Sequence, residues 1–222
     1  AFTGVRKTVD ATEEEYAAIR QGILDMSQND VIASADEIAA VAEAAGQLGI
    51  QKEHLLDFSK VMIDLGESTN LSADDAASKL AKFANVVRMD QGDFDRLGSV
   101  IVDLGNNFAT TEADIVEMGT RLASTGELTG LSEAQIMALS TALSSLGIEA
   151  EAGGSAASKI LKSLQLAVET GKGLEDYASI ANMSQDAFKK MFKSDALKAL
   201  SAFTKGLNDT ERNGKSAVAI LD

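Results

Sequence analysis

Residues 128–158, which read LTGLSEAQIMALSTALSSLGIEAEAGGSAAS, decide the fold class of this chain. Ser132 stands where a helix N-cap belongs, and Gln135 follows three residues later as the second half of a capping box. Gly147 is suited to the left-handed conformation that ends a helix. Between the cap and this glycine, apolar side chains recur at helical spacing: Ile136, Leu139, Leu143 and Leu146. The stretch therefore predicts an amphipathic helix that ends at a glycine.

The chain repeats this pattern of cap, apolar stripe and glycine. Capping boxes are predicted at five positions, Thr12, Ser34, Ser72, Thr111 and Ser132. The stripe that begins near Gln51 is expected to end at Gly66. Gly153 and Gly154 predict a flexible corner before the next stripe, which consists of Ile160, Leu161, Leu164 and Val168.

The composition agrees with helices throughout. The 222 residues include no proline, and strand-like alternation of apolar and polar residues is nearly absent. We therefore predict an all-α fold, a compact array of short helical hairpins with about ten helices and no β-sheet.

Charge and cysteine content exclude several classes of protein. The chain has no cysteine, so it has neither a disulfide framework nor a thiolate metal site. No apolar run approaches the roughly 18 residues that a membrane-spanning helix needs. The 34 acidic and 20 basic residues give a formal charge of −14, which repels phosphate backbones and anionic lipids. We therefore expect no nucleic acid and no membrane among the partners.

An internal match indicates repeats. Residues 61–66, VMIDLG, resemble residues 100–105, VIVDLG, thirty-nine positions later, and the cap Ser72 falls on Thr111 without a gap. A period near forty residues is typical of helical-hairpin repeats. Leu-Gly pairs at 48–49 and 146–147 echo the pattern. True duplication and convergence of helix signals are both compatible with two clear copies.

We divide the chain into three parts. Residues 1–11 have little periodicity and are expected to be a lead-in tail, and residues 12–170 form a helical-hairpin domain. After Gly171 and Gly173 the sequence becomes more basic and aromatic, which favours a smaller helical subdomain at residues 171–222.

The residues that could carry chemistry do not form a recognisable active site. His54 is the single histidine, and zinc would need several nitrogen or sulfur ligands. Residues 90–95, DQGDFD, lack the ligand pattern of a calcium loop and are interpreted as a helix start. Glu149 and Glu151 could suggest the two carboxylates of a glycosidase, but an exposed acidic loop is the simpler interpretation.

Two other patterns receive structural interpretations. Residues 171–173, GKG, lack the ending of a phosphate-binding loop and predict a turn between helices. Asp64 and Asp103 are equivalent in the repeat, which indicates a structural role near a helix end. We therefore nominate no catalytic, cofactor-binding or metal-binding residue and predict that the chain is not an enzyme.

Several segments, in this order, resemble the conserved region of phage tail tape measure proteins. The resemblance covers roughly residues 34–207. Its carriers are AAGQLGI at 44–50, TNLS at 69–72, LAKFAN at 80–85, TGLSE at 129–133, ALSSLGI at 142–148, AGGSA at 152–156, MSQDAF at 183–188 and ALSAFTKGL at 199–207.

The resemblance implies a structural virion protein of the phage tail, made in the cytoplasm of the bacterial host, in a family whose total length sets tail length. The implied partners are tail-tube proteins, tail-tip proteins, an assembly chaperone and further copies of the chain. The predicted helices of about 12–17 residues are too short for a continuous ruler helix, so we expect a docking module within a longer protein. A helical scaffold unrelated to phage and a cell-wall hydrolase domain are the alternatives.

Overall fold

The computed structural model describes residues 2–212, and every regular element in that range is a helix. This confirms the all-α class and the absence of a sheet from the described residues, with twelve α-helices where about ten were expected. In chain order the helices are α1 (Phe2–Thr8), α2 (Glu13–Asn29), α3 (Ala35–Gln47), η1 (Lys52–His54, a 3₁₀ helix), α4 (Leu55–Ser68), α5 (Ala73–Val87), η2 (Gln91–Asp93, also 3₁₀), α6 (Phe94–Asn107), α7 (Glu112–Leu128), α8 (Glu133–Ser144), α9 (Ala150–Thr170), α10 (Leu174–Ile180), α11 (Gln185–Ser194) and α12 (Ala196–Arg212).

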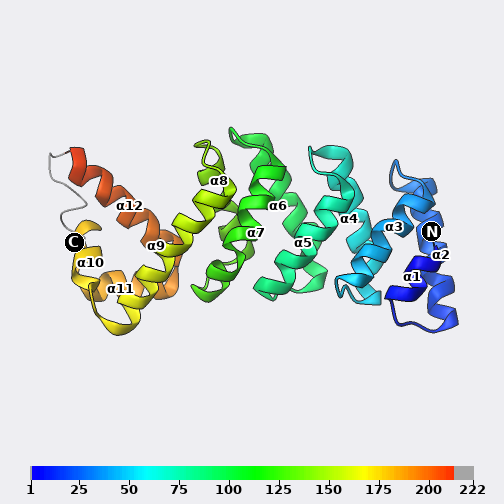
Figure 1. The fold of residues 1–222 in the computed structure, drawn as a ribbon, viewed down its shortest axis with the longest axis horizontal. Coiled ribbons are helices and arrows are strands. Elements are labelled where there is room, and N and C mark those ends of the chain that lie inside the picture. The colour runs from blue at the N-terminus through cyan, green and yellow to red at the C-terminus, as the bar shows by residue number, and fades with distance from the viewer. Residues whose placement is uncertain (1, 213–222) are drawn as a thin grey trace.

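Helices α2 to α9 form four hairpins that stack side by side from the N-terminal end of the molecule (Figure 1). The first helices of the hairpins, α2, α4, α6 and α8, contact one another in sequence along one layer. The second helices, α3, α5, α7 and α9, do the same along the other layer. Each hairpin therefore covers the apolar face of its neighbour, as in repeat proteins whose units cannot bury a core alone.

The predicted repeat is present in the structure and extends over all four hairpins. Helices α4, α6 and α8 begin at residues 55, 94 and 133, and η1 and η2 begin at residues 52 and 91, so these starts are all 39 residues apart. The second helices begin at residues 35, 73, 112 and 150, which are 38 or 39 residues apart. The match of two segments thus marks a structural repeat that also includes the flanking hairpins.

Gly66, which was expected to end a helix, lies inside one, and so does its repeat equivalent Gly105. Helices α4 and α6 continue past Gly66 and Gly105, and they end at Ser68 and Asn107. A Cβ on Gly66 would lie 2.9 Å from the backbone nitrogen of Ala73, so this glycine allows α4 and α5 to approach closely at their turn. Gly147, in contrast, has a φ of +73°, which confirms the left-handed turn predicted there.

The flexible corner expected at Gly153 and Gly154 is wrong, because both residues are buried in the first turns of α9. A Cβ on Gly153 would lie 3.0 Å from Cε of Met118, and one on Gly154 would lie 2.8 Å from Cβ of Arg121. The helix tolerates the low intrinsic propensity of these glycines because they let α9 pack directly against α7.

Three of the five predicted capping boxes are complete, namely those of Thr12, Ser34 and Ser132. Ser72 and Thr111 accept the expected bond from the backbone of the third helical residue, but the return bond is missing. The third residue there is an aspartate, whose shorter side chain bonds the capping hydroxyl instead, at 3.0 Å between Asp75 Oδ2 and Ser72 Oγ.

The segment expected to be a lead-in tail, residues 1–11, contains helix α1. Val5 is fully buried, and α1 packs against α3. The Tyr16 hydroxyl donates a hydrogen bond to the carbonyl oxygen of Val9 at 2.5 Å, which fixes the segment after α1. Only two apolar residues of α1 and its C-terminal flank are buried, Val5 and Val9, so the sequence shows too little periodicity to reveal the helix.

Helices α10, α11 and α12 pack against one another and against α9 at the C-terminal end of the array (Figure 1). Gly171 and Gly173, with φ of +77° and +73°, form the predicted turn between α9 and α10. The buried apolar side chains form one cluster that extends from Val5 to Phe203. The domain boundary at residue 171 stays a prediction.

Candidate functional site

The residues considered for chemistry are scattered over the array. His54 ends η1 and is half-buried, and its Cε1 would lie 3.8 Å from a Cβ placed on Gly92 of the next hairpin. Among the residues that the structure describes, no group of three or more histidine or carboxylate side chains could hold a metal ion. His54 therefore lies near the backbone of the next hairpin and belongs to no such group.

The acidic stretch at 90–95 starts a helix, as predicted. The Asp90 carboxylate accepts a hydrogen bond from the backbone nitrogen of Gly92 at 2.7 Å at the start of η2. Asp93 pairs with Arg96 at 3.3 Å. These bonds occupy both carboxylates within the connection between hairpins.

The equivalent residues Asp64 and Asp103 line a shallow groove of about 420 Å³ between α4 and α6. Asp64 pairs with Lys60 at 2.6 Å, and Asp103 accepts a hydrogen bond from Nδ2 of Asn107 at 3.0 Å. Both carboxylates thus bond within their own helix near its C-terminal end, which agrees with the structural role expected for them.

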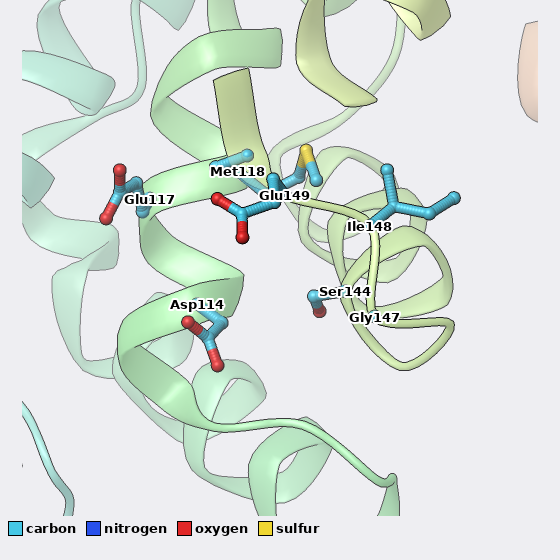
Figure 2. Close-up of a pocket in the computed structure, with 8 residues that line it drawn as sticks. Asp114, Glu117, Met118, Ser144, Gly147, Ile148 and Glu149 are labelled. Atoms are coloured by element: carbon cyan, nitrogen blue, oxygen red, sulfur yellow. The ribbon is translucent and has the colours of Figure 1, made fainter. Parts of the chain in front are cut away.

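Glu149 and Glu151 do not form a carboxylate pair around one space. Glu149 precedes α9 and lines a pocket of about 260 Å³ between α7 and the turn that joins α8 to α9. Figure 2 shows that its neighbours around this space are Asp114, Glu117 and Ser144, whereas Glu151 does not line the pocket. The pocket contains three carboxylates and no basic side chain, and its apolar lining is Met118, Ile148 and Ala150.

A second pocket, of about 290 Å³, lies at the same place in the first two hairpins. It is lined by side chains of α3, of the end of α4 and of the start of α5, together with Ile32 and Ala33. The first pocket lies where the turn between α4 and α5 faces α3, and the other lies where the turn between α8 and α9 faces α7. The same kind of pocket therefore occurs twice along the repeat.

We call the end of the array that contains these turns the turn edge, and define it as residues 27–38, 64–76, 103–115 and 141–152. Because the helices of a hairpin are antiparallel, all four turns lie on one edge of the array (Figure 1). The four segments contain twelve acidic residues and no lysine or arginine. The acidic residues are Asp30, Asp36, Glu37, Asp64, Glu67, Asp74, Asp75, Asp103, Glu112, Asp114, Glu149 and Glu151.

The turn edge also exposes large apolar side chains. Ile32 is 93% exposed and Leu146 is 76% exposed, and Phe108 lies in the same position of the α6–α7 turn as Leu146 in the α8–α9 turn. Hydrophobic side chains that are exposed together beside a pocket are typical of protein interaction sites. This edge is the candidate functional site.

The opposite edge holds the connections between hairpins, and we call it the connector edge, residues 9–12, 48–54, 88–93 and 129–132. Polar side chains bond across it from one hairpin to the next. Gln91 accepts a hydrogen bond from the backbone nitrogen of Gln51 at 2.8 Å and donates one to the carbonyl oxygen of Gly49 at 3.1 Å. Arg88 pairs with Glu127 at 3.6 Å.

An ion pair at the connector edge joins the first two hairpins. Lys52 Nζ lies 2.9 Å from the carboxylate of Glu15, which also accepts the backbone N–H of Thr12 in the capping box. The bond from Lys52 and then the bond from Thr12 lower the pKa of Glu15, and the bond to Glu15 raises the pKa of Lys52. This ion pair therefore joins α2 to the connector that precedes α4.

The pattern of the turn edge was present in the sequence but was not recognised there. Acidic residues recur just after the caps of α3, α5, α7 and α9, which is also the placement that helix dipoles favour. Only the arrangement of hairpins shows that these helix starts share an edge.

No described helix is both long and apolar enough to span a membrane. A family model described as phage-related minor tail protein matches residues 20–221. No curated protein and no solved structure matches the chain. The family match begins within α2 and covers the rest of the four hairpins and helices α10 to α12.

Proposed function

The chain belongs to the family of phage-related minor tail proteins, and from this membership we propose that it is a helical docking module of a tape measure protein. Membership makes it a structural component of the phage tail. The more specific role, in tail assembly and in determining tail length, is our proposal. The observation that carries it is the turn edge, an exposed acidic and apolar surface on an otherwise internally bonded array.

The helix lengths support docking rather than measurement by this region itself. The longest described helix, α9, has 21 residues and turns at Gly171, whereas a ruler needs an extended element. In our proposal the remainder of a longer chain sets the length, and this module holds that chain to other tail proteins. The division into a hairpin domain and a subdomain from residue 171 is part of the same proposal.

We propose that the module acts by binding alone and is not an enzyme. The residues that could have formed an active site lie in separate hairpins, and most of them bond to their own helix or its neighbour. The proposed partners are proteins of the tail tube and tail tip, an assembly chaperone and further copies of the chain. The formal charge of −14 opposes binding to nucleic acid or anionic membranes. The module would be made in the bacterial cytoplasm and reside in the virion.

Removal of the module from the phage tests this function. We expect a phage whose minor tail protein lacks residues 2–212 to produce no tails, or tails of variable length, in electron micrographs. The matched control retains the module with Leu128→Ser, a substitution of the exposed last residue of α7, outside the turn edge, and should produce tails of normal length. Normal numbers of tails with uniform, unchanged length after deletion would overturn the proposal.

A further inference from the structure

The two turn-edge pockets are repeats of each other. Adding 77, the offset from the start of α3 to that of α7 and from the start of α5 to that of α9, converts positions of α3 and the start of α5 that line the first pocket into positions that line the second. The corresponding pairs are Glu37 and Asp114, Ala40 and Glu117, Val41 and Met118, Ser72 and Glu149, and Ala73 and Ala150. In α4 and α8, whose starts are 78 residues apart, Gly66 corresponds to Ser144. The fold therefore presents one kind of pocket twice, two hairpins apart.

Each pocket combines apolar side chains with carboxylates. In the first, Val41 and Ala73 accompany the carboxylates of Glu37, Glu67 and Asp74. In the second, the corresponding Met118 and Ala150 accompany the carboxylates of Asp114, Glu117 and Glu149. Such a lining suits an aliphatic side chain flanked by cationic ones.

The equivalent place between the two pockets, where α5 faces the turn between α6 and α7, is lined differently. Glu112 occupies the repeat position of Ala73 and Ala150, and its side chain lies against Gly105, where a Cβ would be 2.3 Å from Glu112 Oε1. Lys79 occupies the position of Val41 and Met118, and it pairs with Glu117 at 4.0 Å. Larger, charged residues therefore take the place of the small and apolar residues that line the two pockets.

Exposed apolar side chains lie beside both pockets. Ile32 lines the first, and Ile148, which is 37% exposed and follows Leu146 by two residues, lines the second. The acidic residues around them, without any lysine or arginine in the four turn segments, attract a basic partner and repel an acidic one.

We propose that the turn edge binds one extended, basic segment of another tail protein, with an aliphatic side chain in each pocket. This inference deepens the docking role proposed above and rests on it for the source of the segment. The two aliphatic side chains that occupy the pockets are the anchors of the segment. Charge complementarity favours lysine and arginine between these anchors.

The repeat predicts the spacing of those anchors. Packed helices lie about 8–10 Å apart, so α3 and α7, two steps apart in one layer, are separated by roughly 16–20 Å. An extended chain advances about 3.3 Å per residue, so six residues span that distance. Six is an even number, and both side chains then project from the same face of the segment.

A synthetic peptide tests the proposal with the whole chain. The probe is fluorescein-labelled GSKLKSKSKLKSG, whose leucines are six residues apart, and binding is measured by anisotropy at low salt. The control peptide, GSKLKSLSKKKSG, has the same composition and charge with its leucines three residues apart. We expect the control to bind about tenfold more weakly, because it can place only one leucine in a pocket.

Paired variants of the protein locate the site. Ile32→Ser with Leu146→Ser, and separately Glu67→Gln with Glu149→Gln, should each weaken binding of the probe about tenfold. The glutamines retain an acceptor, so Glu67→Gln keeps the bond that Ile32 donates to the side chain of residue 67 at 2.8 Å. The control Leu128→Ser and the pair Glu14→Gln with Glu53→Gln, which remove exposed groups from the opposite half of the array, should leave the affinity unchanged.

Several results would overturn the inference. Absence of binding, equal binding of both peptides, or equal effects of the control variants would show that the turn edge does not select this segment. Sedimentation that shows self-association abolished by the turn-edge variants would assign the edge to a second copy instead. If the peptide fails while deletion of the module still disrupts tails, the docking function stands and this inference alone is wrong.

Discussion

The turn edge and the connector edge are built from the same helices but differ in how their charged side chains are paired. At the connector edge, Gln91 and Lys52 bond to neighbouring hairpins, so polar groups hold the array together. At the turn edge hydrogen bonds also link neighbouring hairpins, such as the one that the Ile32 backbone donates to Glu67, but most of the acidic side chains face solvent. The comparison indicates that hydrogen bonds join the hairpins at both edges, whereas ion pairs between hairpins lie at the connector edge and most carboxylates of the turn edge are available for a partner.

The largest expected effect tests the close approach at the turn edge. Gly66→Ala places a Cβ 2.9 Å from a backbone nitrogen that cannot move without shifting α5, so we expect a loss of about 2 kcal/mol in the free energy of unfolding. The repeat-equivalent Gly105→Ala meets only the flexible side chain of Glu112, and its better helix propensity should leave stability unchanged or raise it by about 0.5 kcal/mol. Urea unfolding of both variants measures the difference. Equal effects would contradict the distinction between backbone and side-chain neighbours.

The next effect concerns the bonds between hairpins. Gln91→Ala removes two hydrogen bonds to the preceding connector, and we expect it to lower the free energy of unfolding by about 1.5 kcal/mol. Asn70→Ala, at the turn edge, removes one exposed bond, which the backbone nitrogen of Ala113 donates at 3.1 Å, and should cost about 0.5 kcal/mol. A larger loss for Asn70→Ala in the same urea titration would contradict the expectation that the connector-edge bonds contribute more to the free energy of unfolding.

The pH dependence of stability should report the ion pair of the connector edge. Because the pKa of Glu15 is lowered in the folded state, its contribution is present above its ordinary value of 4.5 and is lost as the pH falls through the folded value. Glu15→Gln should therefore lower the thermal midpoint at pH 7 and have progressively less effect below pH 4.5. A difference from the wild type that is constant across this range would show that the charge of Glu15 is not responsible.

The smallest effect is expected from neutralising the turn edge. Glu67→Gln with Glu149→Gln removes two negative charges from a surface without basic residues, so stability should rise by a few tenths of a kcal/mol at low salt. The gain should disappear in 0.5 M salt, where charges are screened over a few ångströms. A loss of stability in thermal unfolding would show that the negative charges of these two side chains support the fold.

Much of the fold could be predicted from local patterns. The caps at Thr12, Ser34 and Ser132 and the left-handed Gly147 follow from interactions within one turn of chain, so the sequence reveals them. Gly153 and Gly154 were misinterpreted because a glycine that ends a helix and one that admits a neighbouring helix look the same locally. Helix α1 was missed because α3, distant in sequence, supplies the partner for its buried valine.

By itself the sequence determined the helix class, most helix starts, the 39-residue period and the acidic charge, since each depends on neighbouring residues or on composition. The tertiary structure alone decided which helix ends share an edge and which glycines lie between packed helices. The physical reason is that the stacking of antiparallel hairpins brings together turns about 39 residues apart in the sequence. Interactions between residues that are close in the sequence do not depend on which turns become neighbours.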